Sequence, residues 1–192
     1  MNRKIFTILL LLCVCFCMQA ARLPRHTKSE HLCFREIPIC GPEKAMRDSL
    51  RTRDFRFGYD RRIKGYQGLV AGRKMTMQIW TTPESQEVYS LVAFGPKIRK
   101  WDLLKAQYLE LKELLHQKYG RPLQHTERFH KLAITRNARR RAVTQGKCDY
   151  RSVFRADGGL IILYIDSDRR ICIEFQDATG NAINEEEILR EL

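Results

Sequence analysis

One segment constrains the fold more than any other: a two-sided helix predicted over residues 100–119. Its apolar side chains recur at steps of three and four, and charged or amide side chains occupy the other side. Gly120 follows where a left-handed residue ends many helices, and Pro122 blocks continuation. The apolar stripe consists of Trp101, Leu104, Tyr108, Leu111, Leu114 and Leu115. We expect this stripe to pack on a sheet.

Strands are predicted on both sides of this helix. Apolar residues alternate with the period of two of an extended chain, and short turn sequences separate neighbouring runs, which favours antiparallel meanders. Before the helix, a strand over 32–39 and a helix from Pro42 lead into four strands at 54–59, 66–71, 75–81 and 88–94. After it come strands at 149–155, 160–165 and 171–175, and a last helix for which Asn184 is a suitable N-cap.

Residues 123–147 have no clear period. We interpret them as a basic, mobile loop with a short strand-like excursion near residues 129–134. Because the strands are otherwise segregated from the helices, the predicted fold class is α+β. Two helix-then-antiparallel-meander units would form a sheet with helices packed on one face, in a single domain spanning residues 31–192.

The N-terminus has the pattern of an export signal. Basic residues precede an apolar run of about 14 residues, Ile5 to Met18, and the small pair Ala20-Ala21 follows. A membrane anchor is the alternative, but about 20 apolar residues are needed to cross a bilayer. We therefore expect a signal peptide over 1–21, a flexible leader over 22–30 and an exported protein, periplasmic or extracellular, with no transmembrane segment in the mature chain.

Seven cysteines fall to four when the signal is removed. An even number in an exported chain is typical of disulfides, with three connectivities, although buried thiols are an equal alternative. An extended strand over 33–40 would separate its ends by more than about 20 Å and exclude a bond between them. The four are Cys33, Cys40, Cys148 and Cys172. They lack Cys-x-x-Cys spacing, so we expect no zinc.

The chain is strongly basic. Loss of Arg3 and Lys4 with the signal lowers the formal net charge from +13 to +11. Such a charge attracts polyanions, but it also serves simply as a solvated surface. The basic side chains form one group within residues 47–64 and another within 136–141, without the interleaved aromatics of a base-stacking platform. The candidate polyanion-binding residues are Arg61, Arg62, Arg136, Arg139, Arg140 and Arg141.

Several short motifs carry a family resemblance. They are Phe34-Arg-Glu-Ile-Pro-Ile-Cys-Gly41, Gly65-Tyr-Gln-Gly68, Trp101, Tyr108, Leu115, Lys118-Tyr-Gly-Arg-Pro122, Asp177 and Asn181. Together they resemble small, largely uncharacterised exported proteins of Bacteroidota with Ile-Pro-Ile and Lys-Tyr-Gly-x-Pro motifs. Glu36 stands where that pattern has glycine. The repeated helix and meander resemble, more loosely, the architecture of β-lactamase inhibitor protein. Neither likeness implies a catalytic residue.

The chemistry-bearing residues form no strong catalytic motif. His125 and His130 do not share a helical face as in His-Glu-x-x-His, and Asp166 and Asp168 fall at a predicted turn. We therefore expect a non-enzymatic module that binds another envelope or extracellular macromolecule, with no cofactor and no metal. The alternatives are a polyanion-binding protein using its arginine clusters and a small hydrolase whose site forms only on folding.

Overall fold

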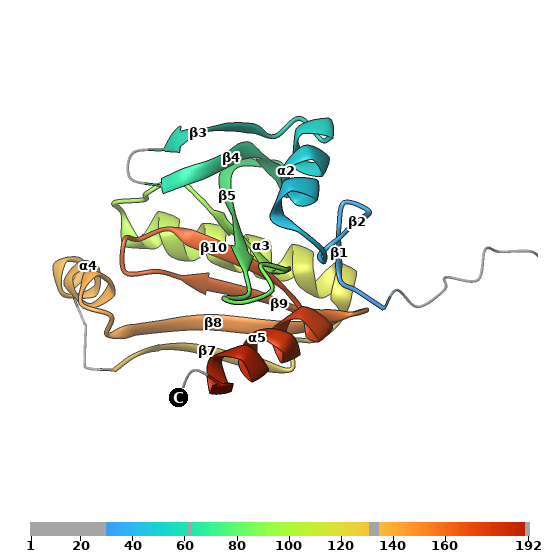
Figure 1. Ribbon diagram of the computed structural model, residues 1–192. Helices are drawn as coiled ribbons and strands as arrows, with labels where there is room; N and C mark the ends of the chain where they lie inside the picture. The colour runs from blue at the N-terminus through green and yellow to red at the C-terminus, as the bar shows by residue number, and fades with distance from the viewer. Residues whose placement is uncertain (1–29, 61–62, 131–134, 191–192) are drawn as a thin grey trace, which may run out of the picture.

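Eight strands form one antiparallel sheet in the order β3-β4-β5-β6-β10-β9-β8-β7 (Figure 1). The computed structural model describes residues 30–60, 63–130 and 135–190. The first meander comprises β3 (Arg56–Asp60), β4 (Ile63–Val70), β5 (Arg73–Thr81) and β6 (Val88–Phe94). The second comprises β7 (Gln124–Phe129), β8 (Cys148–Ala156), β9 (Gly159–Ile165) and β10 (Ile171–Asp177). The last strands of the two meanders, β6 and β10, pair at the centre.

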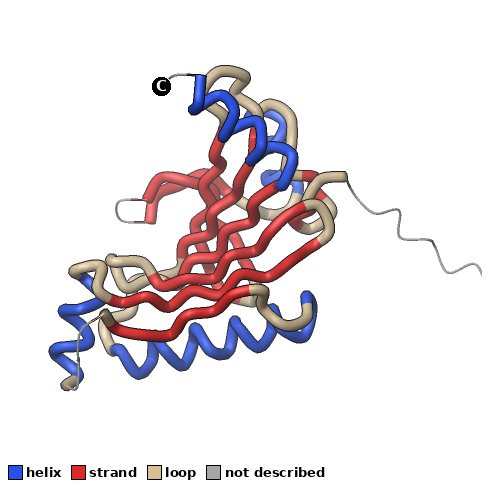
Figure 2. Tube along the Cα trace, turned by 90° about the horizontal axis from the view of Figure 1, so that it is seen from below, coloured by secondary structure: helices blue, strands red, loops and turns tan. Residues whose placement is uncertain are grey.

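A helix precedes each meander, which confirms the α+β class and the repeated unit. The helices are α2 (Glu43–Thr52), α3 (Trp101–Tyr119), α4 (Arg136–Thr144) and α5 (Ala178–Arg190). Both α2 and α3 contribute buried side chains to one core. By contrast, α5 contacts the end of β6, β9 and β10, and Figure 2 shows it on the opposite side of the sheet from α3. No helix within the described ranges is both long and apolar enough to cross a membrane.

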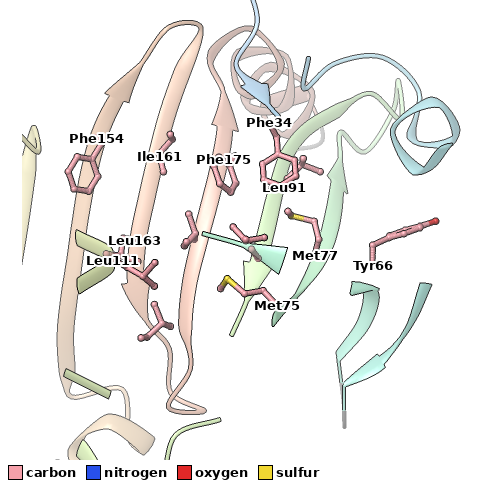
Figure 3. Packing of buried hydrophobic residues seen from close by; sticks show 14 of the residues in the cluster. Phe34, Tyr66, Met75, Met77, Leu91, Leu111, Phe154, Ile161, Leu163 and Phe175 are labelled. Atoms are coloured by element: carbon pink, nitrogen blue, oxygen red, sulfur yellow. The ribbon is translucent and has the colours of Figure 1, made fainter. Parts of the chain in front are cut away.

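The core lies between the sheet and the helices α2 and α3. Alternate residues of neighbouring strands point toward it, so Phe175 pairs with Leu91 and Ile173 with Leu163, all of them buried (Figure 3). The predicted stripe of α3 supplies the other side through Leu104, Tyr108 and Leu111. Leu114, which was predicted in this stripe, is 44% exposed instead. The period-two and helical patterns therefore meet on one interface, as expected.

The N-terminal segment departs from its prediction. Instead of one strand over 32–39, a small hairpin pairs β1 (Cys33–Phe34) with β2 (Ile37–Pro38). Arg35 and Glu36 form its turn with φ of 48° and 67°. Two consecutive left-handed residues are typical of the two-residue turns that close hairpins. The single-strand prediction was wrong because neither turn residue is glycine, asparagine or aspartate, the usual signal for this geometry.

Two later predictions were also wrong. Within 123–147, the structure has the edge strand β7 and the helix α4, whose N-cap Thr135 accepts a hydrogen bond from the Ala138 N–H at 3.1 Å. The last helix begins at Ala178, where Asp177 accepts from the Gly180 N–H at 2.8 Å, and Asn184 lies inside it. The signal peptide and nearly all of the leader lie outside the described residues.

Candidate binding surfaces

The predicted arginines that the structure describes all lie on one helix. Arg61 and Arg62 lie outside the described residues, while the other four lie on α4. Arg136, Arg140 and Arg141 are exposed, and Arg139 is half-buried. Figures 1 and 2 place α4 at a different end of the molecule from α2, which carries Arg47 and Arg51.

The two basic groups differ in their partners. Around α2, Arg47 pairs with Glu43 at 2.5 Å, Arg51 with Asp48 at 2.9 Å and Arg53 with Glu36 at 3.3 Å. These contacts pair three arginines of that group with carboxylates. α4 itself has no acidic residue, and Arg136 pairs with Asp102 of α3 at 3.4 Å. Of the two groups described, α4 therefore presents the more concentrated positive charge.

A second surface lies at the free corner of the first meander. Within the described residues, the exposed aromatic side chains are Phe57, Tyr59 and Trp80, at 50%, 66% and 47%. Phe57 contacts Tyr59 and Tyr66 edge to face, with centroids 6.3 and 5.4 Å apart. Trp80 lies where the pairing of β5 with β6 shifts register, a feature that often redirects a side chain. We name Phe57, Tyr59, Lys64 and Trp80 the aromatic corner.

The sheet opens at this corner. β4 pairs with β5 only from Tyr66 to Val70, so residues 63–65 have strand partners in β3 alone. The side-chain amide of Gln78 donates to the Lys64 carbonyl at 3.2 Å across the gap. Figure 1 shows the β3–β4 hairpin turning away from β5. A groove of about 380 Å³ results, lined by the aromatic residues Phe57, Tyr66 and Trp80 and by Ile79, Lys64, Glu43 and Arg47.

The corner also has an unpartnered sheet edge and a cation. β3 is the first strand of the order and pairs only with β4, so its outward N–H and C=O groups have no strand partner in the described structure. The Lys64 ammonium lies 5.5 Å from the centre of the Phe57 ring, a cation–π distance. An open edge beside exposed aromatic side chains is an attachment point for another extended chain.

The face opposite α3 carries a half-buried carboxylate near the centre of the sheet. Ser90 donates to Glu174 at 3.3 Å across the β6–β10 pair. Burial raises the pKa of Glu174, and the Ser90 hydrogen bond and the Arg151 charge oppose that shift. Burial likewise raises the pKa of Asp166 near the end of β9. These groups are desolvated, but no described histidine contacts them.

The closest approach to a catalytic pair is His31 with Asp177, whose Nδ1 and Oδ2 lie 3.1 Å apart. Asp177 is fully buried and also accepts from the Leu32 N–H at 2.7 Å and from Gly180. These three contacts tie the N-terminal segment to the start of α5. The buried Asp177 carboxylate therefore has a structural role in joining these two segments.

Three of the cysteine thiols have raised pKa values. Cys40, Cys148 and Cys172 are free cysteines, so none of the three disulfide connectivities is formed. Burial raises the pKa of each, and for Cys148 to about 12. A nucleophilic cysteine needs a lowered pKa, so these three offer no support for a cysteine hydrolase.

Neither a metal site within the described residues nor a similarity to known proteins assigns a function to this chain. In the described part of the chain, no three His, Cys, Asp or Glu side chains are grouped to hold a metal ion. Searches for similarity to protein families, to curated proteins and to solved structures found no match.

Sequence reasoning missed the aromatic corner. Phe55, Phe57 and Tyr59 alternate like a single core-facing stripe, yet only Phe55 is buried. The two glycines of the neighbouring strand, Gly65 and Gly68, were the available signal for the burial of Phe55. An added Cβ on Gly68 would approach the Phe55 ring to 2.5 Å, so this position must lack a side chain. The glycines therefore indicate that Phe55 is buried, but they do not indicate that Phe57 and Tyr59 are exposed.

Proposed function

We propose that this protein is an exported, non-enzymatic binding module whose main interface is the aromatic corner. The observation that carries the proposal is the gathering of Phe57, Tyr59 and Trp80, the exposed aromatic residues of the described chain, beside an unpartnered sheet edge. Tyrosine and tryptophan are enriched among residues that dominate protein interfaces. Export rests on the N-terminal pattern of residues 1–21.

The partner that this geometry favours is an extended segment of another protein. A strand added to β3 would bond the outward backbone groups, while alternate side chains would meet Phe57 and Tyr59. An apolar side chain suits the groove between β4 and β5, and an acidic one suits Lys64. Main-chain bonds would supply affinity, and the groove would supply selectivity.

Peptide display against the mature protein tests this proposal. We expect selected peptides to bind in extended form, and Tyr59→Ala or Trp80→Ala to weaken them by about tenfold or more, the scale of an interface hot spot. Leu123→Ala is the matched control, because Leu123 is 50% exposed but lies outside the corner. N-methylation of single peptide amides should abolish binding at every second position, where the N–H faces β3, and should have little effect at the positions between. Peptides indifferent to both truncations, or to the methylation pattern, would exclude this interface.

The export component has its own test. N-terminal sequencing of the natural protein should find a chain beginning near residue 22 in the envelope or medium. An intact N-terminus on cytosolic protein would reject export without bearing on the corner.

Polyanion binding is a second candidate, and α4 is the observation that favours it. Its exposed arginines lack acidic neighbours within the helix, unlike those of α2. Each DNA phosphate neutralised contributes about −0.9 to the slope of log K against log salt. Arg140→Ser with Arg141→Ser should therefore reduce that slope by roughly two, while Arg47→Ser with Arg51→Ser should leave it unchanged. Equal effects of the two pairs would indicate net charge alone.

A further inference from the structure

A second groove, mainly apolar, lies on the side of the sheet that α2 and α3 cover. Its volume is about 280 Å³, and it runs between the β1–β2 hairpin, the β4–β5 turn and the C-terminal half of α3. Phe34, Val70, Leu111 and Phe175 are buried side chains of its floor. Leu114 is 44% exposed at its rim. We name this the hairpin groove.

The groove follows from how the two helices divide the sheet. α3 contacts β8, β9 and β10, whereas α2 contacts β5. The small hairpin fills part of the space between them, and Phe34 packs on Phe175 with ring centroids 5.0 Å apart (Figure 3). The ring centroid of Phe55 lies 5.8 Å from that of Phe34. Leu115 and Tyr119, in the last turns of α3, are half-buried and line the groove.

The charged residues that line the groove are all positively charged. Arg35 and Lys118 are the charged residues of its lining, and no ion pair in the described structure includes either. Arg35 donates to the Leu69 carbonyl at 2.7 Å, which fixes its guanidinium over the hairpin. The Lys118 ammonium lies 5.0 Å from the Tyr119 ring centre. An apolar floor with cations at the rim complements a ligand with an apolar body and an anionic end.

We propose that the hairpin groove binds an anionic amphiphile, a linear alkyl carboxylate. The alkyl chain lies on Leu111, Leu115 and Phe175, and the carboxylate lies at the rim near Arg35 and Lys118. This site is separate from the aromatic corner and does not depend on the function proposed there.

Calorimetric titration of the mature protein with octanoate, decanoate and dodecanoate tests the apolar half of the proposal. Each buried methylene should tighten binding about fourfold, so each two-carbon step gives roughly fifteenfold until the groove is filled. Dodecyltrimethylammonium has the same chain with a cationic head, and it should bind at least about fivefold more weakly. Binding without chain-length dependence, or equal binding of the cation, would overturn the proposal.

Matched variants on α3 locate the site. Leu114→Asn should weaken dodecanoate binding about three- to tenfold, because it replaces part of the apolar rim. Leu103→Asn is the control, with similar exposure (49%) on the same helix but outside the groove. Lys118→Gln should reduce dodecanoate affinity about two- to fivefold, as for an exposed charge pair, and Lys105→Gln should not.

Three outcomes contradict the assignment. Binding unchanged by both Leu114→Asn and Lys118→Gln would exclude the groove. Binding lost in Tyr59→Ala would move the amphiphile to the aromatic corner. A protein that dimerises in sedimentation experiments and stays dimeric in saturating dodecanoate would show that a second copy occupies this face. Loss of peptide binding at the corner with dodecanoate binding intact would reject only the proposed function.

Discussion

The hydroxyl of Tyr108 on α3 lies 2.7 Å from that of Ser152 on β8, and both residues are completely buried. Burial raises the pKa of Tyr108, so the phenol stays protonated and available as a hydrogen-bond donor. This hydrogen bond and the edge-to-face contact between the Tyr108 and Tyr150 rings fix the rotation of α3 over the second meander.

Tyr108→Phe should destabilise the protein by about 1–3 kcal/mol, because it leaves the Ser152 hydroxyl buried without its partner. Tyr108→Phe combined with Ser152→Ala removes both polar groups, so its loss should be smaller than the sum of the two single losses. Urea unfolding of the four proteins measures these free energies. Strictly additive losses would show that the two hydroxyls are independent.

Gly180→Ala should destabilise the contact between α5 and β6 by about 1–3 kcal/mol. A Cβ at this position would lie 2.9 Å from the Tyr89 Cβ and 3.0 Å from its Cα. The helix must therefore move, although alanine is the better helix former by about 1 kcal/mol. Thermal unfolding checks the result against Thr179→Ala, an exposed position on the same helix. A Gly180→Ala variant as stable as that control would mean that α5 packs more loosely.

Glu36→Gly should stabilise the protein by about 0.5–1 kcal/mol. Glu36 has φ of 67°, a conformation that costs a residue with a Cβ about 1–2 kcal/mol, and the extra freedom of an unfolded glycine offsets part of that gain. The ion pair with Arg53 is lost, but the Glu36 side chain is 87% exposed, so this pair contributes little to stability. Glu36→Ala removes the charge and keeps the Cβ, so it should not stabilise. Chemical denaturation distinguishes the two variants.

Glu174→Gln should increase stability at neutral pH. The folded pKa of Glu174 is raised by burial, so its ionisation opposes folding. That penalty is absent below the unfolded pKa and complete above the folded one, so wild-type stability falls as pH rises between them. The difference between variant and wild type should therefore vanish in acid. Ser90→Ala removes a hydrogen bond that lowers this pKa and should enlarge the pH dependence. Unfolding free energies measured across this pH range check both signs.

The core was predictable because it rests on local periodicity. The α3 stripe and the alternation of Met75 and Met77 in β5 each specify a buried face without reference to distant residues. The glycine that the resembling pattern has in place of Glu36 was not interpreted as a turn, and the left-handed turn of the hairpin was missed. The pattern resemblance itself stays a prediction.

The binding surfaces were not predictable, because they depend on where elements end relative to one another. The divergence of β4 from β5 at the residues before Tyr66 leaves no mark in the alternation of either strand. The arginine-rich α4 has a strongly polar sequence, and only Ala142 and Val143 are buried in it. Such a helix is held by tertiary contacts more than by its own apolar stripe.

The pairing of β6 with β10 also orders events during synthesis. β6 is complete at Phe94, but its central partner spans Ile171–Asp177, close to the end of the chain. Until those residues emerge from the ribosome, the buried strand Val88–Phe94 is an apolar edge with nothing on one side. We therefore expect the N-terminal half to gain a stable fold only once the C-terminal half has been synthesised.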